Sequence, residues 1–448
     1  MSTIAAISTP SGIGGIAVIR LSGADAFAIA SRHLTLPKPV AGRPAAAFAQ
    51  FRKDGELLDE VVVTVFPSPH SYTGDDTVEI SCHGSLYIQQ TLLQILIDTG
   101  ARLAEPGEFT QRAFLNGKLD LSQAEAVADL IDSTNAATHR LAVSQLRGGY
   151  AKELEQLRQQ LIDLTALLEL ELDFSEEDLQ FADRNHLQSL VEQITLRVKA
   201  LLHSFHMGNT LKRGIPVAII GRPNAGKSSL LNALLRDNRA IVSDIPGTTR
   251  DTIEETFVIE GTPFRIIDTA GLRHSDDEIE QMGVQRTLNT IAQADIILYI
   301  HDATQPFSQT LDDLQQLQGT ISIKDKHLFV IHNKIDLLKD VLPDDVQFPI
   351  SVKEGIGIDR LSQKLADVAH SDMPNTPDVM LTNARHYQAL GHVDQALHSV
   401  AVGLNSNLSA DLIVIDLRDA LHHLGTITGQ VTTDEVLGTI FSRFCIGK

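Results

Sequence analysis

Hydrophobic and polar positions follow two different periods along the chain. In the N-terminal part, short apolar runs with β-like spacing cover residues 16–21, 61–66 and 77–81, and glycine and proline turns separate them. One helical stretch is predicted over residues 85–99. These patterns predict a compact α+β domain that covers residues 1–118.

From residue 119 the apolar spacing becomes helical. Ser122 to Glu125 form a capping-box pattern ahead of one helix, and leucines at helical spacing run through residues 153–173. We interpret those leucines as an ordinary core stripe and not as a coiled-coil seam. A further helix is predicted over residues 187–205.

Helical patterns return after residue 377. Ser409 is placed to cap one helix, and Thr432 to Glu435 fit a second capping box ahead of the last helix. The chain is therefore expected to be helical again beyond Pro377.

The simplest arrangement of these elements is one helical domain interrupted by an inserted α/β domain. The helical domain would comprise residues 119–211 and 373–448, with residues 212–372 inserted between its halves. Helices from both sides of the insert would then share a core. Two separate helical bundles are the structural alternative. The predicted fold class is multidomain: an α+β domain, a split all-helical domain and an inserted α/β domain.

Composition narrows the function classes. The chain has 448 residues, of which 43% are hydrophobic and 21% charged, enough for about three domains. The net charge of -20 argues against a protein that coats nucleic acid, so any RNA contact must use a local basic patch. Cys82 and Cys445 lie far apart in the sequence and imply no disulfide framework. We find no signal peptide or membrane span and expect a cytoplasmic protein.

A phosphate-binding loop is the strongest chemical signal in the inserted region. Residues 221–228, GRPNAGKS, match G-x-x-x-x-G-K-[ST] and lie between a strand predicted at 215–220 and a helix predicted at 229–235. The glycines let backbone N–H groups approach phosphate oxygens. Lys227 can reach the β- and γ-phosphates, and the Ser228 hydroxyl can bind Mg²⁺.

Three more nucleotide signals follow in order. Asp268 begins the sequence DTAG after an apolar strand, where a carboxylate can hold the Mg²⁺ shell. Asp336 ends the sequence NKID and can accept two hydrogen bonds from guanine, a donor pair that adenine lacks. Ser351 begins SVK, whose backbone can cover the purine O6. The four signals together predict a GTPase. The residues predicted to bind GTP are Asn224, Ala225, Gly226, Lys227, Ser228, Ser229, Ser243, Thr248, Thr249, Asp268, Thr269, Ala270, Gly271, Asn333, Lys334, Asp336, Ser351 and Lys353.

The first switch of a GTPase is expected at residues 243–251, SDIPGTTRD. One threonine there must offer its hydroxyl to Mg²⁺, and we assign this role to Thr249.

The usual water-orienting side chain is missing after the DTAG sequence. Leu272 stands where many GTPases place a glutamine, and leucine cannot orient water. Hydrolysis therefore needs another polar group and another cation. Arg250 or Arg273 could supply the charge, and Glu278 or Glu280 could hold the water. The spacing alone does not choose among them.

Several longer segments resemble one protein family. They are TPSGIGGIAVIRLSG, SYTGDDTVEISCHG, EPGEFTQRAFLNGKLDLSQAEAVADLIDS and the terminal FSRFCIGK, besides the GTPase motifs, and they cover all parts of the chain. The chain resembles the bacterial and organellar tRNA modification GTPases called MnmE or TrmE. The GTPase motifs occur in many proteins, whereas the N-terminal segments and FCIGK are much more specific.

This resemblance implies a folate-binding N-terminal domain, a split helical domain and an inserted Ras-like P-loop GTPase domain. It implies a homodimer formed through the N-terminal domains and a complex, a heterotetramer or larger, with the flavoprotein MnmG (GidA), which carries FAD. Together they would add a (carboxymethyl)aminomethyl group at C5 of the wobble uridine of certain tRNAs. A reduced folate, of the 5,10-methylene- or 5-formyl-tetrahydrofolate type, would supply the one-carbon unit.

The resemblance also implies roles for individual residues. G domains of the family pair across the nucleotide, and K⁺ takes the place of an arginine finger. Glu280 matches the residue that orients the attacking water, and Cys445 matches a residue needed for modification. The positions that match K⁺ ligands are Asn224, Ser243, Ile245 and Thr248, with serine at 243 where threonine is frequent. The positions that match folate contacts are Arg20, Glu79, Lys118 and Lys448.

Two other function classes compete with this interpretation. A ribosome-assembly or regulatory GTPase switch would share the nucleotide motifs, but such proteins usually carry a basic RNA-binding module. A nucleotide-regulated scaffold would hydrolyse GTP without taking part in the chemistry. The acidic composition and the folate-like N-terminal domain favour the tRNA modification enzyme.

Overall fold

The computed structural model describes most of the chain and divides it into two compact units. It describes residues 2–39, 42–133, 135–173, 184–238, 255–267, 288–306, 308, 314–315, 326–338, 347–371, 380–406, 408–442 and 444–448. One unit comprises Met1–Ile131, Gln145–Ile194 and His392–Lys448, and the other comprises Asp132–Ser144 and Thr195–Gly391.

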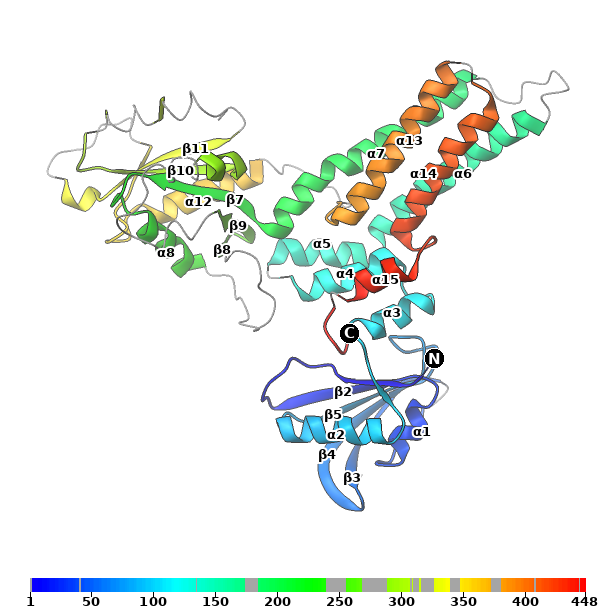
Figure 1. Cartoon of the computed structure of the whole chain (residues 1–448). Coiled ribbons are helices and arrows are strands. Elements are labelled where there is room, and N and C mark those ends of the chain that lie inside the picture. Colours follow the sequence, from blue (N-terminus) through cyan, green and yellow to red (C-terminus); the bar gives the residue numbers. More distant parts are fainter. Residues whose placement is uncertain are drawn as a thin grey trace. The chain divides into compact units, whose positions relative to one another are not determined.

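The N-terminal part of the first unit is an α+β fold around one sheet. Described strands pair in the order β3-β4-β5-β2-β1-β6, with only the β1–β6 pair parallel among them. Figure 1 shows α2 lying against this sheet. The strands are β1 (Ile4–Ile7), β2 (Ile16–Ser22), β3 (Ala45–Lys53), β4 (Glu56–Phe66), β5 (Thr77–His83) and β6 (Arg102–Leu103), and the helices are α1 (Ala26–Ser31) and α2 (Leu86–Asp98).

One face of this sheet is buried in a core, and the other carries exposed side chains. Alternate strand positions such as Ile19, Val63 and Ile80 are fully buried in a core that includes residues of α1 and α2. The opposite face carries Phe48, which is 88% exposed, and Ile16, which is 70% exposed. An antiparallel sheet can leave one of its faces open to solvent in this way.

The helical part of the first unit joins segments from before and after the inserted domain. Helix α14 packs along α6, and the α6 leucines Leu157, Leu161 and Leu164 are fully buried. Helices from both sides of the insert therefore share a core, as expected for one split helical domain. The helices are α3 (Glu108–Leu115), α4 (Leu121–Ile131), α6 (Gly149–Asp173), α14 (Ala410–Thr428) and α15 (Asp434–Phe441), while α5 (Ala136–Leu146), α7 (Arg184–Arg213) and α13 (Ala384–Asn405) each run through both units.

Two predicted capping boxes are wrong by a few positions. Helix α4 begins before Ser122, because Asp120 accepts a hydrogen bond from the Gln123 N–H at 2.9 Å while the Gln123 side chain accepts from the Asp120 N–H at 3.0 Å. This reciprocal pair is the real capping box. Helix α15 is capped by Thr433, whose side chain accepts from Val436 N–H, one position after the expected Thr432. Ser409 is the N-cap of α14, without a side-chain cap bond.

The second unit holds a parallel sheet of the type predicted for the inserted region. The order of its described strands is β12-β11-β10-β7-β9-β8, in which β8 pairs antiparallel and the rest parallel. One core lies between this sheet and α8 and α12. The elements are β7 (Ile215–Gly221), α8 (Lys227–Asn238), β8 (Glu255–Ile259), β9 (Thr262–Ile266), β10 (Ile296–Asp302), β11 (His327–Asn333), the short 3₁₀ helix η2 (Ile335–Leu337), β12 (Phe348–Pro349) and α12 (Ile358–Ser371).

The described helices are all unlike membrane-spanning helices. None of them combines the length and the apolar composition that crossing a bilayer requires.

Candidate nucleotide site and C-terminal tail site

The phosphate loop lies between β7 and α8, as its sequence predicts. Gly226 has φ +104°, and a Cβ at this position would clash with the Asn333 side-chain nitrogen. Only glycine therefore lets the loop approach the NKID segment. Asn224, at φ 61°, also has left-handed backbone. The loop and the NKID segment are thus in direct contact in the second unit.

Lys227 is held by its own loop. Its Nζ donates to the carbonyl oxygens of Gly221 and Arg222, each at 2.8 Å. Burial lowers the pKa of Lys227. Both acceptors are neutral, so the lysine can exchange them for phosphate oxygens without breaking an ion pair. Ser228 and Ser229 follow in the first turn of α8.

Asn333 joins three of the four predicted motifs. Its side-chain N–H donates to the Ala225 carbonyl oxygen at 2.9 Å, and its side-chain oxygen accepts from the Val352 N–H at 3.2 Å. The residue is 3% exposed. Because both ends of the amide are used, Asn333 fixes the distance between the phosphate loop and the SVK segment.

Asp336 and Ser351, the residues predicted to lie at the guanine base, bond to each other. The Ser351 hydroxyl donates to Asp336 Oδ1 at 2.6 Å and accepts from the Glu354 N–H at 3.2 Å. This fixes the Asp336 carboxylate in one orientation, as recognition of a guanine edge requires. The Lys353 side chain lies 3.9 Å from Glu354 and is 79% exposed.

Asp302 contacts one of the predicted nucleotide motifs, although the sequence analysis did not name it. It ends β10, between the strands that lead to the phosphate loop and to NKID, and accepts from Lys334 Nζ at 2.6 Å. The available signal was a carboxylate at the carboxyl end of a buried parallel strand.

Ten other predicted positions lie outside the described residues. They include the first switch, the DTAG sequence and the proposed water-orienting glutamate. They are Ser243, Ile245, Thr248, Thr249, Arg250, Asp268, Thr269, Ala270, Gly271 and Glu280. The alternative candidates Arg273 and Glu278 lie outside the described residues as well. The expected Mg²⁺, K⁺ and catalytic arrangements that depend on them stay predictions.

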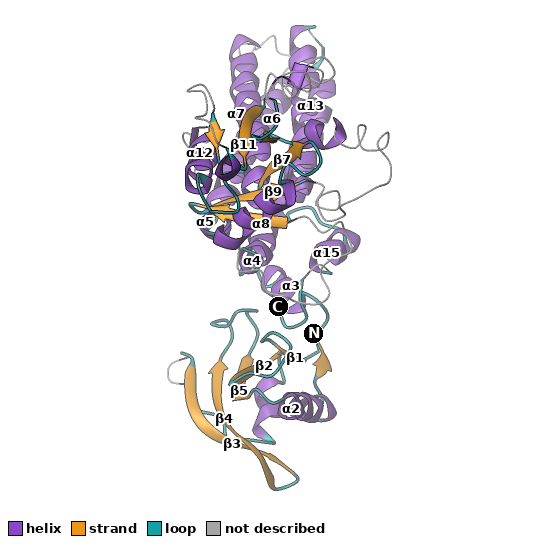
Figure 2. Ribbon diagram, turned by 90° about the vertical axis from the view of Figure 1, so that its left-hand side faces the viewer, coloured by secondary structure: helices purple, strands orange, loops and turns teal. Residues whose placement is uncertain are grey.

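The C-terminal tail contacts the N-terminal sheet of the same chain. Arg20 Nη1 donates to the Gly447 carbonyl oxygen at 3.4 Å, and the Ser8 hydroxyl donates to the same oxygen at 3.1 Å. Gly447 has φ +99°, and a Cβ there would clash with the Ile7 carbonyl oxygen. The chain end lies beside α3 in Figure 1 and Figure 2.

The same tail also accepts hydrogen bonds from the start of α3. The Gly107 N–H donates to the Cys445 carbonyl oxygen at 3.4 Å, and the Phe109 N–H donates to the Lys448 oxygen at 3.2 Å. These donors belong to the first turn of the helix, whose N–H groups lack partners within the helix. The tail therefore provides acceptors for two N–H groups at the start of α3, while Cys445 itself is exposed.

Arg20 and Glu79 face each other across β2 and β5. Their side chains form an ion pair at 2.8 Å. Two residues absent from the predicted set flank the guanidinium, Tyr72 and Phe109, with each ring centroid 5.5 Å from Arg20 Cζ. Arg20, Tyr72, Glu79, Phe109 and Gly447 are called the tail site below. Aromatic rings beside a cation could be expected from the quoted segments, but the sequence does not show which ones meet.

Lys118 and Tyr72 connect this site to one loop. Lys118 Nζ donates to the Pro69 carbonyl oxygen at 3.0 Å, and the Tyr72 hydroxyl bonds to the Thr110 hydroxyl at 2.9 Å. Burial raises the pKa of Tyr72, although its bond to Thr110 and the charge of Arg20 oppose the change. The loop of residues 67–76 is thereby held against α3.

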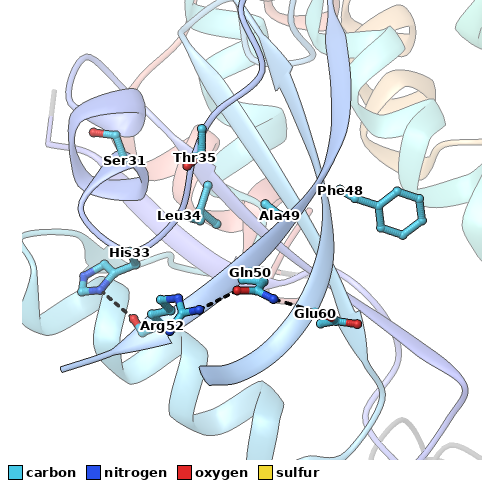
Figure 3. Close-up of a pocket in the computed structure, with 9 residues that line it drawn as sticks. All are labelled: Ser31, His33, Leu34, Thr35, Phe48, Ala49, Gln50, Arg52 and Glu60. Atoms are coloured by element: carbon cyan, nitrogen blue, oxygen red, sulfur yellow. Dashed lines mark hydrogen bonds between the residues drawn. The ribbon is translucent and has the colours of Figure 1, made fainter. Parts of the chain in front are cut away.

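A cavity of about 780 Å³ lies elsewhere on the N-terminal domain. Figure 3 shows its lining, with Phe48 projecting away from the other side chains. Several of its polar groups already bond to one another, since Arg52 donates to Gln50 at 2.6 Å and Gln50 donates to Glu60 at 3.4 Å. The lining contains no predicted site residue, and we assign it no ligand.

Comparisons with known proteins decide the family. The model described as "GTP-binding protein TrmE N-terminus" matches residues 3–118, and the model "MnmE helical domain" matches residues 121–445. The tRNA modification GTPase MnmE of Parabacteroides distasonis is 50% identical over 465 residues, covering 100% of both chains. The chain belongs to the MnmE family.

Other relatives agree with this assignment. The MnmE protein of Flavobacterium johnsoniae is 46% identical and covers 100% of this chain and 99% of that one. A structure of Era with MgGDPNP and a 16S ribosomal RNA segment is 27% identical, covers 40% of this chain and 66% of that one, and has a TM-score of 0.26, which adds nothing to the assignment. As an MnmE family member, this chain is a GTP-binding GTPase of tRNA modification.

Proposed function

We propose that this chain works as a homodimer with a flavoprotein partner of the MnmG type, which carries FAD. The complex installs a (carboxymethyl)aminomethyl group at C5 of the wobble uridine of certain tRNAs. The tail site binds a reduced folate of the 5,10-methylene- or 5-formyl-tetrahydrofolate type, which supplies the one-carbon unit. The observation that supports this most directly is the bond between Arg20 and Gly447, because it puts the Cys445 segment beside a paired cation and carboxylate.

The charges of the tail site suit a folate. Arg20 can bind a carboxylate of the glutamate tail, and Glu79 can accept hydrogen bonds from the N–H groups of a pterin. These two residues now pair with each other at 2.8 Å, so ligand binding exchanges one charged partner for another. Lys118 and Lys448 would add positive charge for the ligand's carboxylates. Cys445 is exposed on the tail and is our candidate for a residue that acts in the modification chemistry.

In the inserted domain, Lys227 would leave its two carbonyl acceptors for the nucleotide's phosphates, and Asp336 would bind guanine. Ser228 and Thr249 would hold Mg²⁺. Asn224 already has the left-handed backbone that turns the loop. The K⁺ ligands are assigned to Asn224, Ser243, Ile245 and Thr248, and K⁺ would supply positive charge where other GTPases use an arginine. Glu280 would orient the attacking water, with Arg250 as a further charge.

The open face of the N-terminal sheet supports a homodimer. Phe48 and Ile16 are large apolar side chains that remain exposed there, and burial of such surface favours association. The same face carries Arg20 and Glu79, by the register of β2 and β5. A dimer formed through this face would place two tail sites close to the shared interface.

Truncation of the tail tests the proposal. Deleting residues 445–448 removes the Gly447 acceptor and Cys445 while leaving the nucleotide motifs intact. We expect weaker binding of 5-formyl-tetrahydrofolate by calorimetry and no wobble-uridine modification in complemented cells. GTP turnover in K⁺ should be largely unchanged. Thr439→Ala on the exposed side of α15 is the matched control and should leave all three readouts unchanged.

Survival of modification after truncation would show that the tail is only a structural end. A folate-dependent rise in melting temperature separates the proposal from its alternative, a ribosome-assembly or regulatory GTPase switch, because only a folate-binding protein is stabilised by that ligand. Absence of this rise in the full-length chain favours the switch.

A further inference from the structure

Two lysines of the nucleotide site have opposite environments. Lys227 Nζ bonds to two neutral carbonyl oxygens of its own loop. Lys334 Nζ instead bonds to the carboxylate of Asp302 at 2.6 Å. The first lysine is ready to bind an anion, whereas the charge of the second is already neutralised by the protein. The two cations therefore have different tasks in one site.

Asp302 is itself fixed on both oxygens. Its Oδ2 accepts from Lys334, and its Oδ1 accepts from the Thr304 hydroxyl at 2.7 Å and from the Thr304 N–H at 3.0 Å. Burial alone would raise the pKa of Asp302, but these hydrogen bonds and the Lys334 charge outweigh it and lower the pKa. The carboxylate therefore stays ionised at neutral pH and keeps a constant orientation.

Lys334 needs such support because its backbone is unusual. It has φ 68° and ψ 34°, a left-handed conformation that is uncommon for residues other than glycine. A second bond holds the same segment to β10, since the Ala303 N–H donates to the Asn333 carbonyl oxygen at 2.9 Å. The NKID segment is thus attached to the end of β10 through both a main-chain bond and an ion pair.

From this geometry we infer that Asp302 is a positioning residue for guanine nucleotide binding. Its carboxylate bonds the Lys334 side chain to the end of the neighbouring strand β10. This bond keeps the NKID segment in the conformation that binds the nucleotide. It also neutralises the Lys334 charge, which leaves Lys227 as the lysine that acts at the phosphate loop. Asp302 touches no reacting atom in this role. Preorganisation of this kind lowers the entropy cost of binding and does not change the chemical step.

Affinity and turnover should therefore respond differently to Asp302→Asn. We expect the dissociation constants of GDP and GTP to rise about 10-fold, measured with a fluorescent nucleotide on the full chain. The kcat at saturating GTP should stay within about twofold of wild type. Asp302→Glu, which keeps the charge, should recover part of the lost affinity. Asp367→Asn on the exposed side of α12 is the matched control and should bind normally.

A double-mutant cycle with Lys334→Met decides whether Asp302 acts through the lysine. If it does, Asp302→Asn should add little to the loss already caused by Lys334→Met. Additive losses, or normal affinity in Asp302→Asn alone, would overturn the inference.

Misfolding must be separated from mispositioning. Melting of each nucleotide-free variant reports on the fold, and Thr304→Val offers a milder change that removes only one bond to Asp302. This variant should weaken nucleotide binding about threefold with kcat preserved. An equal loss of kcat in Thr304→Val would assign the pair to the chemical step and contradict a positioning role.

Discussion

The described nucleotide site draws its residues from loops that follow three neighbouring parallel strands, whereas the tail site joins segments from both ends of the chain. Asn333 ends β11, Lys334 and Asp336 follow it directly, and Lys227 follows β7 after a short loop. By contrast, the bond between Arg20 and Gly447 spans 427 positions. The first arrangement is set by local sequence at the carboxyl edge of one sheet, and the second depends on the fold of a whole unit.

This difference teaches that the two sites can fail separately. The nucleotide motifs lie within the inserted domain, and the tail site contains none of them. Closing the long tail contact costs chain entropy, which Phe441 and Phe444 help to offset through their buried contacts with α4 residues. Mutations in one site should therefore leave the ligand affinity of the other site nearly unchanged, and the predictions below test this separation.

The largest expected effect concerns Glu280. A carboxylate that orients water acts mainly in the transition state, so Glu280→Ala should lower kcat for GTP by about 100-fold or more while GTP affinity stays near wild type. Single-turnover hydrolysis and equilibrium nucleotide binding measure the two quantities. Binding of 5-formyl-tetrahydrofolate should be unchanged. A loss of GTP affinity in step with the rate would mean that Glu280 supports the loop and does not act on water.

An intermediate effect is expected from the monovalent cation. Leu272 provides no water-orienting group, and Asn224 matches a K⁺ ligand, so GTP hydrolysis should be roughly 10-fold faster in K⁺ than in Na⁺ at equal ionic strength. The affinity for folate should be the same in K⁺ and in Na⁺, so folate binding is the internal control. Equal hydrolysis rates in the two salts would remove K⁺ from the mechanism.

The two sites also differ in how far the sequence predicts them. The phosphate loop, Asn333 and Asp336 could be named because the chemistry of the nucleotide imposes fixed residue types at fixed spacing after strands. Asp302 was not named, because a carboxylate after a buried strand is a weak signal whose meaning depends on which strand lies between β7 and β11. The pairing of Arg20 with Tyr72 and Phe109 likewise depends on tertiary contacts that no local pattern encodes.

Local signals were also less reliable where two similar residues competed. Ser122 and Thr432 both fit a capping pattern, yet Asp120 and Thr433 provide the caps. A shift of one or two positions leaves a helix almost unchanged in its apolar stripe, so the hydrophobic period cannot locate its first residue. The family resemblance supplied what spacing could not, including the tail segment that meets Arg20.

The smallest expected effect on GTP turnover comes from labelling the cysteines, and it tests the separation of the two sites. Cys445 lies exposed on the tail, whereas Cys82 is buried in the N-terminal sheet. Burial, reinforced by the negative charge of Asp59, raises the pKa of Cys82 to about 11. A thiol reagent at pH 8 should therefore label one cysteine per folded chain, which peptide mapping should identify as Cys445. The labelled protein should keep GTP turnover within about twofold of the unlabelled one but lose modification activity.

Alkaline pH should reveal the second cysteine through stability. The pKa of Cys82 is higher in the folded chain than in the unfolded one. Its contribution to folding stability is therefore fully present below about pH 9. Between about pH 9 and pH 11 the thiol ionises in the unfolded chain but stays protonated in the folded one. The contribution of Cys82 to the free energy of unfolding is therefore lost as the pH rises through this range. Between pH 8 and pH 10, the melting temperature should fall less in Cys82→Ala than in wild type. In Cys445→Ser it should fall as much as in wild type. Rapid labelling of Cys82 at pH 8 would contradict its burial, and loss of GTP turnover on labelling Cys445 would show that the tail and nucleotide sites are coupled.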